Sequence, residues 1–425
     1  MIELSLPVWL LWLLRWVLFL APLAATLVLA HKRRDKPRAL IGGLFAFLYG
    51  LGTIFVTHEL AIEMGWWHYG GDTQMFRDIP ADIWIGGALA FGPVLALAFP
   101  TVSPFVLLVP IVIGVHGTLF LSLPPLLFPG PNWYFGVVLV FVVAHLPGIY
   151  LAQWTASRQH LGWRVTLLAI GFGCLAFAVL PSAIMEAMGG HWALAERSPV
   201  LLAAGALAIG VCSVMGLAAV QMFALYGNGT AIPLDPTERL VRVGIFAFVR
   251  NPMQLCSALV WIILGAVLQN VWVALAALMA WVFVAGMVRW HHRYDLLLRF
   301  PEGWTEYVAH VPEWRPRWRP WIKHTATLTF DPANAAQDRI VHLLQRVGLT
   351  GLDIRAGGTC SMEYGCEAEG VHRLDGIAAF AMAIHHTNFV GALVGAAVLL
   401  VAVPAAYLRA QLSNLVFSAR FGRAS

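Results

Sequence analysis

Apolar runs of about 20 residues recur along the first two thirds of the chain, and each is long enough to cross a bilayer. Nine such runs lie at residues 7–30, 40–58, 82–99, 104–123, 133–153, 165–185, 199–225, 253–269 and 271–289. Charged residues make up only 12% of the sequence, whereas about 25% is usual for a soluble domain. The sequence therefore predicts an all-α polytopic membrane protein with about nine transmembrane helices.

The loops between these runs indicate the orientation of the chain. Loop 31–38 (HKRRDKPR) contains five Lys and Arg residues, and such basic loops remain on the cytoplasmic side. Alternation from there places the N-terminus and the acidic loop 59–82 outside, and residues 226–250 and the chain after residue 291 inside. The first run is longer than the apolar part of a signal peptide and is followed by basic residues, so we interpret it as a span. We expect a multi-pass protein of the bacterial inner membrane, with the N-terminus outside and the C-terminus inside.

Net charge, histidines and cysteines indicate neither a nucleic-acid partner nor a metal site. The charge of +5 is accounted for by the basic cytoplasmic loops. His116 and His145 are lone histidines in or near apolar runs, where a histidine either packs against a backbone carbonyl or serves as a ligand. Neither has a second ligand at a recognisable spacing, so no metal is expected. The five cysteines form no zinc or disulfide pattern.

The outer loop from His58 to Trp84 has two interpretations. Glu59 and Glu63 are one helical turn apart and share a face, and Trp and Tyr residues follow them. One interpretation is an interfacial aromatic belt with solvated acids. The other is a lipid-substrate or partner site in which these acids are functional. The order of residues in this loop resembles membrane proteins of carotenoid synthesis, including lycopene-cyclase-like ones, so a cyclase or isomerase is a third hypothesis for function.

Residues 226–319 hold most of the polar groups that could perform chemistry. Glycines directly after a span let the backbone turn sharply and leave amides free to meet a ligand. Arg250 and Asn251 precede Pro252, which is tolerated in the first turn of a helix. An arginine at that depth pairs with an anion or extends to lipid headgroups. The hairpin that follows returns His292 to the same face, so we expect either a polar cluster at the mouth of a hydrophobic bundle or simple headgroup anchoring.

The stretch GNGTAIPLDPTERLVRVGIFAFVRNPMQ (227–254) resembles the integral-membrane methyltransferases that include isoprenylcysteine carboxyl methyltransferases and phospholipid N-methyltransferases. The resemblance continues through the hairpin, residues 296–301 and Val311-Pro312, and covers about residues 200–320. It implies transfer of a methyl group from S-adenosylmethionine to a membrane-embedded lipid, isoprenoid or prenylated acceptor, mainly by proximity and orientation. The implied cofactor-binding residues are Gly227, Gly229, Thr230, Arg250, Asn251, Pro252, Met253 and Tyr307. We expect the catalytic residues to be Arg250, His292 and Asp295, of which only Arg250 belongs to the family pattern.

The sequence departs from that family where an acidic pair is expected to hold the amino group of the cosubstrate. His292 and Arg293 stand at these positions, and Trp304 replaces the first tyrosine of the pattern. One hypothesis is that Asp295 replaces the acids from one turn away in an active enzyme. The other is a non-catalytic accessory or structural subunit of a membrane complex, built on a derived methyltransferase fold.

The sequence after residue 322 resembles the thioredoxin-like domains that begin with an Asp-Cys-Cys motif. TLTF (327–330) reads as a first strand, and FDPANAAQD follows where the motif belongs, with Asn334 and Gln337 in place of the cysteines. Thiol exchange needs an attacking thiolate, so this domain should be redox-inactive and suited to binding protein partners. The run 390–408 is either a tenth span or, as we favour, a helix that packs on the domain or lies in the membrane interface. We predict three domains, 1–190, 191–322 and 323–425, the last a small α/β domain in the cytoplasm.

Overall fold

The computed structural model describes residues 7–70, 75–114, 126–357, 361–366 and 371–404. His116, Cys360 and the end of the run 390–408 lie outside the described residues. The chain divides into two compact units, Met1–Trp192 and Ala193–Ser425. A further division of the second unit at residue 322 stays a prediction.

Seven helical segments in the described part of the chain are long and apolar enough to cross a membrane: Trp9–Lys32, Pro37–Glu63, Ala81–Ala98, Trp133–Ser157, Leu161–Met188, Pro199–Gly227 and Val271–Arg299. These segments confirm the prediction of a multi-pass, mostly helical membrane protein. The other two predicted spans coincide with the shorter apolar helices Pro104–Gly114 and Pro252–Leu268. The count of nine and the orientation in the membrane stay predictions.

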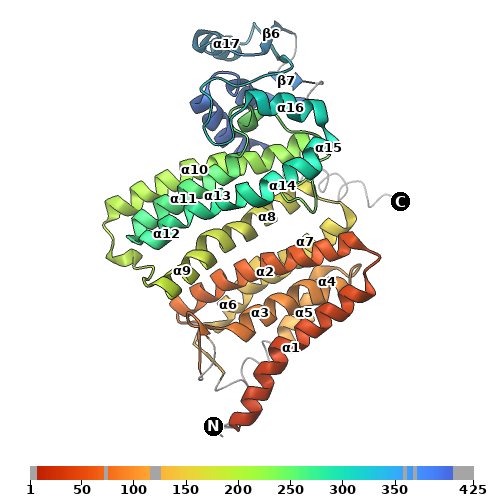
Figure 1. Ribbon diagram of the computed structural model, residues 1–425, viewed down its shortest axis with the longest axis vertical. Helices are drawn as coiled ribbons and strands as arrows, with labels where there is room; N and C mark the ends of the chain where they lie inside the picture. Colours follow the sequence, from red (N-terminus) through yellow and green to blue (C-terminus); the bar gives the residue numbers. More distant parts are fainter. Residues whose placement is uncertain (1–6, 71–74, 115–125, 358–360, 367–370, 405–425) are drawn as a thin grey trace, which may run out of the picture. The chain divides into compact units, whose positions relative to one another are not determined.

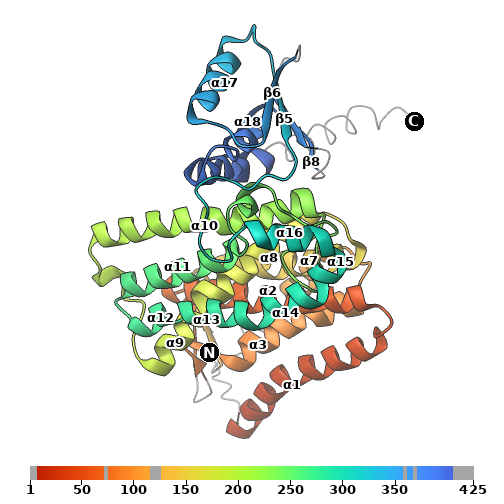
Figure 2. The same ribbon diagram turned by 45° about the horizontal axis from the view of Figure 1, so that its top comes forward.

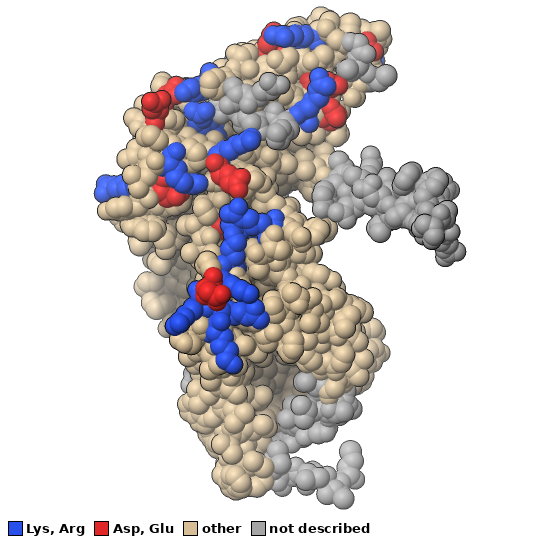
Figure 3. Space-filling model, turned by 90° about the vertical axis from the view of Figure 1, so that its right-hand side faces the viewer, with Lys and Arg blue, Asp and Glu red and all other residues tan. Residues whose placement is uncertain are grey.

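Charged side chains gather in groups on the surface, and broad areas of the same face carry none (Figure 3). Large apolar side chains are exposed along the spans, for example Trp16 on the first and Leu207 on the sixth. Such uncharged helix surfaces are suited to contact with lipid.

The first unit is built around α2, which contacts α3, α6, α7 and α8 (Figure 1). Its helices are α1 (Val8–Lys32), α2 (Pro37–Glu63), α3 (Ala81–Leu89), α4 (Leu95–Ala98), α5 (Pro104–Gly114), α6 (Trp133–Val140), α7 (Leu146–Ser157), α8 (Leu161–Cys174) and α9 (Leu180–Met188). Small residues allow close approach, because a Cβ on Gly42 would lie 2.5 Å from the carbonyl oxygen of Ala152. Between α1 and α3, both carboxylate oxygens of Asp82 accept hydrogen bonds from Arg15, at 2.8 and 3.1 Å.

The loop after α2 is ordered by polar pairs and by two short two-stranded sheets. Strand β1 (Trp67–Tyr69) pairs with β4 (Leu127–Pro129), and β2 (Met75–Phe76) pairs with β3 (Ile79–Pro80), both antiparallel. The Glu59 carboxylate accepts a hydrogen bond from Arg77 at 2.6 Å, and the Tyr69 hydroxyl lies 2.6 Å from Nδ1 of His58. Glu63 is exposed. Glu59 is therefore an ion-pair partner of Arg77, while the cyclase hypothesis for this loop remains untested.

The membrane part of the second unit consists of one long helix and a helical hairpin. Its helices are α10 (Pro199–Gly227), α11 (Pro252–Leu268), α12 (Val271–Leu275), α13 (Ala277–Phe283), α14 (Arg289–His291), α15 (Leu297–Arg299) and α16 (Pro301–His310). Asn270 caps α12 by accepting hydrogen bonds from the backbone N–H groups of Trp272 and Val273. Two π-helical turns, Val284–Val288 and His292–Leu296, continue the return helix to Arg299. The predicted hairpin is confirmed.

A small α/β region follows, as predicted (Figure 2). It contains β5 (Ala326–Phe330), α17 (Ala335–Val347), β6 (Leu352–Ala356), β7 (Glu363–Cys366), β8 (Val371–Asp375) and α18 (Gly376–Ile384). The strand order is β6-β5-β7-β8, with β5 and β6 parallel and the other pairs antiparallel. Asn334 caps α17, and the Gln337 side chain accepts a hydrogen bond from the backbone N–H of Asp331 at 2.8 Å. The two residues that replace the cysteines of the motif thus have structural partners, whereas the thioredoxin-like resemblance stays a prediction.

A last described helix, Phe389–Pro404, ties this region to the membrane helices of the second unit. Its Ala392 is fully buried in a cluster with Ala247 and Phe248. The Gln221 amide on α10 donates a hydrogen bond to the carbonyl of Leu399 at 3.0 Å. One face of the helix is thus packed against the protein, with Ala392, Ala396 and Leu399 fully buried, whereas Val390, Val394 and Val401 on its other side are more than half exposed.

Candidate functional site

A cavity lies within the second unit, between the C-terminal end of α10, the loop after it, the start of α11, the return helix of the hairpin and α16. The open space around these residues is about 860 Å³, with the solvent at the mouth included. It is lined by Phe223, Thr230, Ala231, Ile232, Pro233, Pro236, Thr237, Leu240, Val241, Phe246, Arg250, Asn251, Met253, Gln254, Phe283, Met287, Val288, His291, His292, Leu296, Trp304 and Tyr307.

Four separate segments of the second unit bring most of the predicted site residues to this cavity. The members that line it are Thr230, Arg250, Asn251, Met253, His292 and Tyr307. Gly227, Gly229, Pro252 and Asp295 are not among the lining residues. The predicted set is therefore only partly brought together.

The glycines after α10 serve packing and leave no free amides at Gly229 or Thr230. A Cβ on Gly229 would lie 2.5 Å from the carbonyl oxygen of Pro236, so only glycine fits against that segment. The N–H of Gly229 bonds to the carbonyl of Phe223, and the N–H of Thr230 bonds to the carbonyl of Asp235. The expectation that these amides are free to meet a ligand is wrong. The N–H groups of Gly229 and Thr230 instead hold loop 230–241 against the C-terminal end of α10.

Asn251 occupies the position before the first turn of α11, and Pro252 is the first residue of that turn, as predicted. An asparagine at this position usually caps the helix with its side chain. Here the side chain makes no capping bond, is 3% exposed, and its Nδ2 has no hydrogen-bond partner in the described structure. A buried amide without a partner costs about 1–3 kcal/mol, so this N–H group is suited to a ligand.

Arg250 is held by its backbone, and the Nε of its guanidinium has no hydrogen-bond partner in the described part of the chain. The backbone N–H donates to the carbonyl of Pro312 at 2.9 Å. The side-chain Nε is buried and has no hydrogen bond. An arginine enclosed in this way favours an anionic ligand, because a planar guanidinium matches a carboxylate or phosphate. Arg250 and Asn251 therefore form the polar end of the cavity.

Aromatic side chains, Trp304 and Tyr307 among them, form another part of the cavity wall. The Tyr307 hydroxyl donates to the carbonyl of Phe246 at 2.8 Å, and burial raises the pKa of this tyrosine well above its usual value. Tyr307 thus fixes the wall as a neutral hydrogen-bond donor. The Trp304 ring lies 5.8 Å from that of Tyr307 and 4.5 Å from that of His292, between ring centroids.

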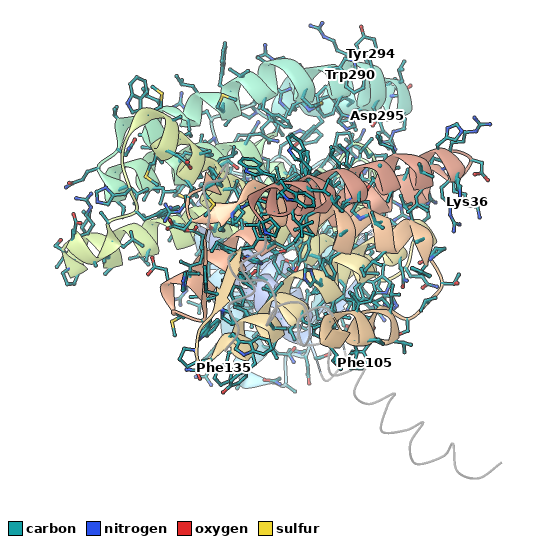
Figure 4. All side chains as sticks on the ribbon, turned by 90° about the horizontal axis from the view of Figure 1, so that it is seen from below. Lys36, Phe105, Phe135, Trp290, Tyr294 and Asp295 are labelled. Carbon is teal, nitrogen blue, oxygen red and sulfur yellow. The ribbon has the colours of Figure 1, made fainter. Side chains whose placement is uncertain are left out.

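The return helix of the hairpin has one face on the cavity and another directed away from it. His291 and His292 line the cavity. Trp290 and Tyr294 are 56% and 64% exposed and project outward (Figure 4). Asp295 lies at the same end of the helix, where its carboxylate accepts a hydrogen bond from Arg299 at 2.8 Å.

Asp295 contacts the cavity only indirectly. Arg299, its partner, also donates to the carbonyl of Thr237 at 2.7 Å and so holds the loop that lines the cavity. His291 lies 3.5 Å from the same carboxylate. The placement argues against the hypothesis that Asp295 replaces the family's acidic pair inside the site. No described lining residue is an Asp or a Glu.

The apolar lining was missed by sequence reasoning, although one signal for it was present. Phe283, Met287 and His291 are spaced by four residues, which places them on one face of a helix. Phe283 and Met287 are also 47% and 50% exposed, so the cavity is bordered by side chains that reach the outer surface of the hairpin. A ligand with an apolar part could therefore approach from the side of the helices.

Two further observations bear on function. Among the described residues, no group of three or more His, Cys, Asp or Glu side chains is placed to hold a metal ion. His145, one of the two histidines singled out in the sequence, stacks on Phe91 with 3.9 Å between ring centroids.

Comparison of the chain with protein-family models, with curated proteins and with solved structures found no match.

Proposed function

We propose that this protein transfers a methyl group from S-adenosylmethionine to an acceptor embedded in the membrane. The observation that carries the proposal is the meeting of Thr230, Arg250, Asn251, Met253, His292 and Tyr307 in one cavity. The resemblance to membrane methyltransferases implies all of them except His292, and they come from four separate segments of the sequence. A match of one segment to the family pattern does not by itself require that these residues meet in space.

The polar end of the cavity fits the amino-acid part of such a cosubstrate. Arg250 has a buried Nε and Asn251 a buried Nδ2, both without partners in the described structure. Two N–H groups side by side in the sequence suit the two oxygens of a carboxylate, and charge-assisted bonds of this kind are about twice as strong as neutral ones. The apolar and aromatic lining suits the adenosine part.

The bound cosubstrate supplies an electrophilic methyl group, and the acceptor supplies the electron pair of the new bond while the carbon–sulfur pair returns to sulfur. The protein's contribution is to hold the two reactants together, which can supply about 7–11 kcal/mol of the barrier. His292 lines the cavity and is placed to accept a proton that an O–H or N–H acceptor loses. An acceptor with an apolar chain would lie against Phe283 and Met287 and reach the cavity from the membrane.

A second candidate function is a non-catalytic subunit of a membrane complex. The observation that favours it is the lack of any Asp or Glu among the described lining residues, since the cosubstrate carries an ammonium group. In that case the cavity would hold an anionic ligand or lipid headgroup, with Arg250 as its partner.

Calorimetry on the detergent-purified protein distinguishes the two functions. We expect micromolar binding of S-adenosylmethionine, weakened at least about tenfold by Arg250→Ala, which corresponds to about 1.4 kcal/mol. Arg289→Ala is the matched control, because Arg289 is half exposed, pairs with Glu313 at 3.1 Å and does not line the cavity. No binding up to millimolar concentration would reject the enzyme and favour the subunit.

A further inference from the structure

The positive groups of S-adenosylmethionine have no carboxylate to pair with among the described residues that line the cavity. The cosubstrate carries a sulfonium and an ammonium group against one carboxylate. The described lining contains Arg250 and two histidines but no carboxylate. Two acids on or beside the segments that form the cavity are already paired, Asp295 with Arg299 and Glu313 with Arg289. The positive sulfur must therefore be recognised by something other than an opposite charge.

Aromatic ring faces are uncharged groups that attract a cation. The ring quadrupole gives the face of Trp, Tyr or Phe a partial negative charge, and Trp is the strongest of the three. Trp304 lines the cavity and is only 7% exposed, so a cation against it would be largely desolvated. Desolvation is the condition under which such contacts reach about 2 kcal/mol, against about 0.5–1 kcal/mol at exposed sites.

The Trp304 ring is also held in place. It packs in a cluster with Tyr307 and Val311, and Tyr307 is itself anchored by the bond of its hydroxyl to Phe246. Leu240, Leu296 and Phe300 pack against the same cluster. A ring that is fixed before binding loses little entropy when a cation arrives, which favours recognition over simple filling of space.

We infer that Trp304 determines specificity for the sulfonium form of the cosubstrate, by presenting its ring to the positive sulfur in place of a carboxylate. This inference rests on the proposed function. Tyr307 supports the ring, and Arg250 with Asn251 binds the carboxylate at the polar end. The site then distinguishes the charged cosubstrate from its neutral thioether product, and product release follows from loss of the cation contact.

The test compares S-adenosylmethionine with S-adenosylhomocysteine, which lacks the methyl group and the charge on sulfur. Both affinities are measured by calorimetry for the wild type, Trp304→Leu and Trp304→Phe. We expect Trp304→Leu to weaken binding of S-adenosylmethionine roughly five- to thirtyfold and to leave S-adenosylhomocysteine within about twofold. Trp304→Phe keeps a ring and should fall between the two proteins.

The outcomes separate the inference from the proposed function. Equal losses for the two compounds in Trp304→Leu would overturn the inference, because the ring would then only fill space. A wild type that binds both compounds without preference would overturn it as well, even if neither variant folds. A wild type that binds neither compound rejects the proposed function, and the inference falls with it.

Discussion

Two arginines in apolar surroundings, one in each unit, have opposite environments. Arg15 on α1 is bonded to both oxygens of Asp82, and the two side chains are 7% and 14% exposed. Arg250, just before α11, has a buried Nε that makes no hydrogen bond in the described structure. Charged residues within membrane segments are costly and usually either pair or mark a functional site. The difference indicates that Arg15 serves the fold, whereas Arg250 is left for a ligand.

The largest expected effect breaks the structural pair. Asp82→Asn leaves Arg15 buried without a counter-charge, and we expect the free energy of unfolding to fall by about 3–5 kcal/mol. The double change Arg15→Met with Asp82→Leu should recover most of that loss, because no buried charge remains. Arg250→Ala should lower stability by less than about 1 kcal/mol. Equilibrium unfolding of all variants in one detergent measures their free energies of unfolding. An equal loss of stability in Asp82→Asn and Arg250→Ala would remove the distinction between the two arginines.

Buried histidines extend the comparison to the α/β region. The His386 ring bridges the Tyr364 hydroxyl and the carbonyl of Thr350, both at 2.8 Å, and the Nδ1 of His385 lies 2.8 Å from the carbonyl of Ala381. Burial lowers the pKa of each histidine to about 4. A group whose pKa is lower in the folded protein stabilises it fully above the unfolded value of about 6.5 and loses this contribution as pH falls toward 4.

We therefore expect the α/β region to lose about 2 kcal/mol per histidine between pH 7.5 and pH 5. Hydrogen exchange of residues 326–386 at the two pH values measures the loss. The double variant His385→Gln with His386→Gln should be less stable at pH 7.5 but less sensitive to pH. A pH response that is the same in the double variant would show that other groups control it.

Two asparagines before helices give a smaller effect of the same kind. Asn334 caps α17, whereas Asn251 makes no capping bond to α11. Asn334→Ala should lower stability by about 1 kcal/mol and leave cosubstrate affinity unchanged. Asn251→Ala should do the reverse, with stability within about 0.5 kcal/mol of the wild type and weaker binding in calorimetry. Loss of stability in both variants alike would place Asn251 among the structural residues.

The smallest effect is expected at Asp295. Its carboxylate orients Arg299, which holds the carbonyl of Thr237, so it acts on the cavity through one intermediate side chain. Asp295→Ala should change the affinity for S-adenosylmethionine by less than about threefold, or about 0.7 kcal/mol. A loss as large as that of Arg250→Ala in the same titration would return Asp295 to the binding site.

The sequence was sufficient for features that depend on local composition. Apolar length predicts the spans, and Pro252 predicts the start of α11, because both follow from residues adjacent in the chain. The site needed contacts between distant residues. The close approach of Gly229 to Pro236, the pairing of Glu59 with Arg77 and the partnership of Asp295 with Arg299 are each decided by how loops fold back. No local pattern specifies whether an asparagine before a helix caps it or, like Asn251, leaves its amide free.

The position of the helix Phe389–Pro404 near the end of the sequence determines when its contacts can form during synthesis. Phe248, two residues before Arg250, packs against Phe389 with 5.8 Å between ring centroids, and α10 bonds to Leu399. A ribosome completes all of the spans up to Arg299 well before it reaches these partners. The segment that carries Arg250 therefore receives its contacts with this helix after membrane insertion, and later than the bond between Arg250 and Pro312. A nascent chain that stops short of residue 389 would already be embedded in the bilayer but would lack the packing of Phe389 on Phe248.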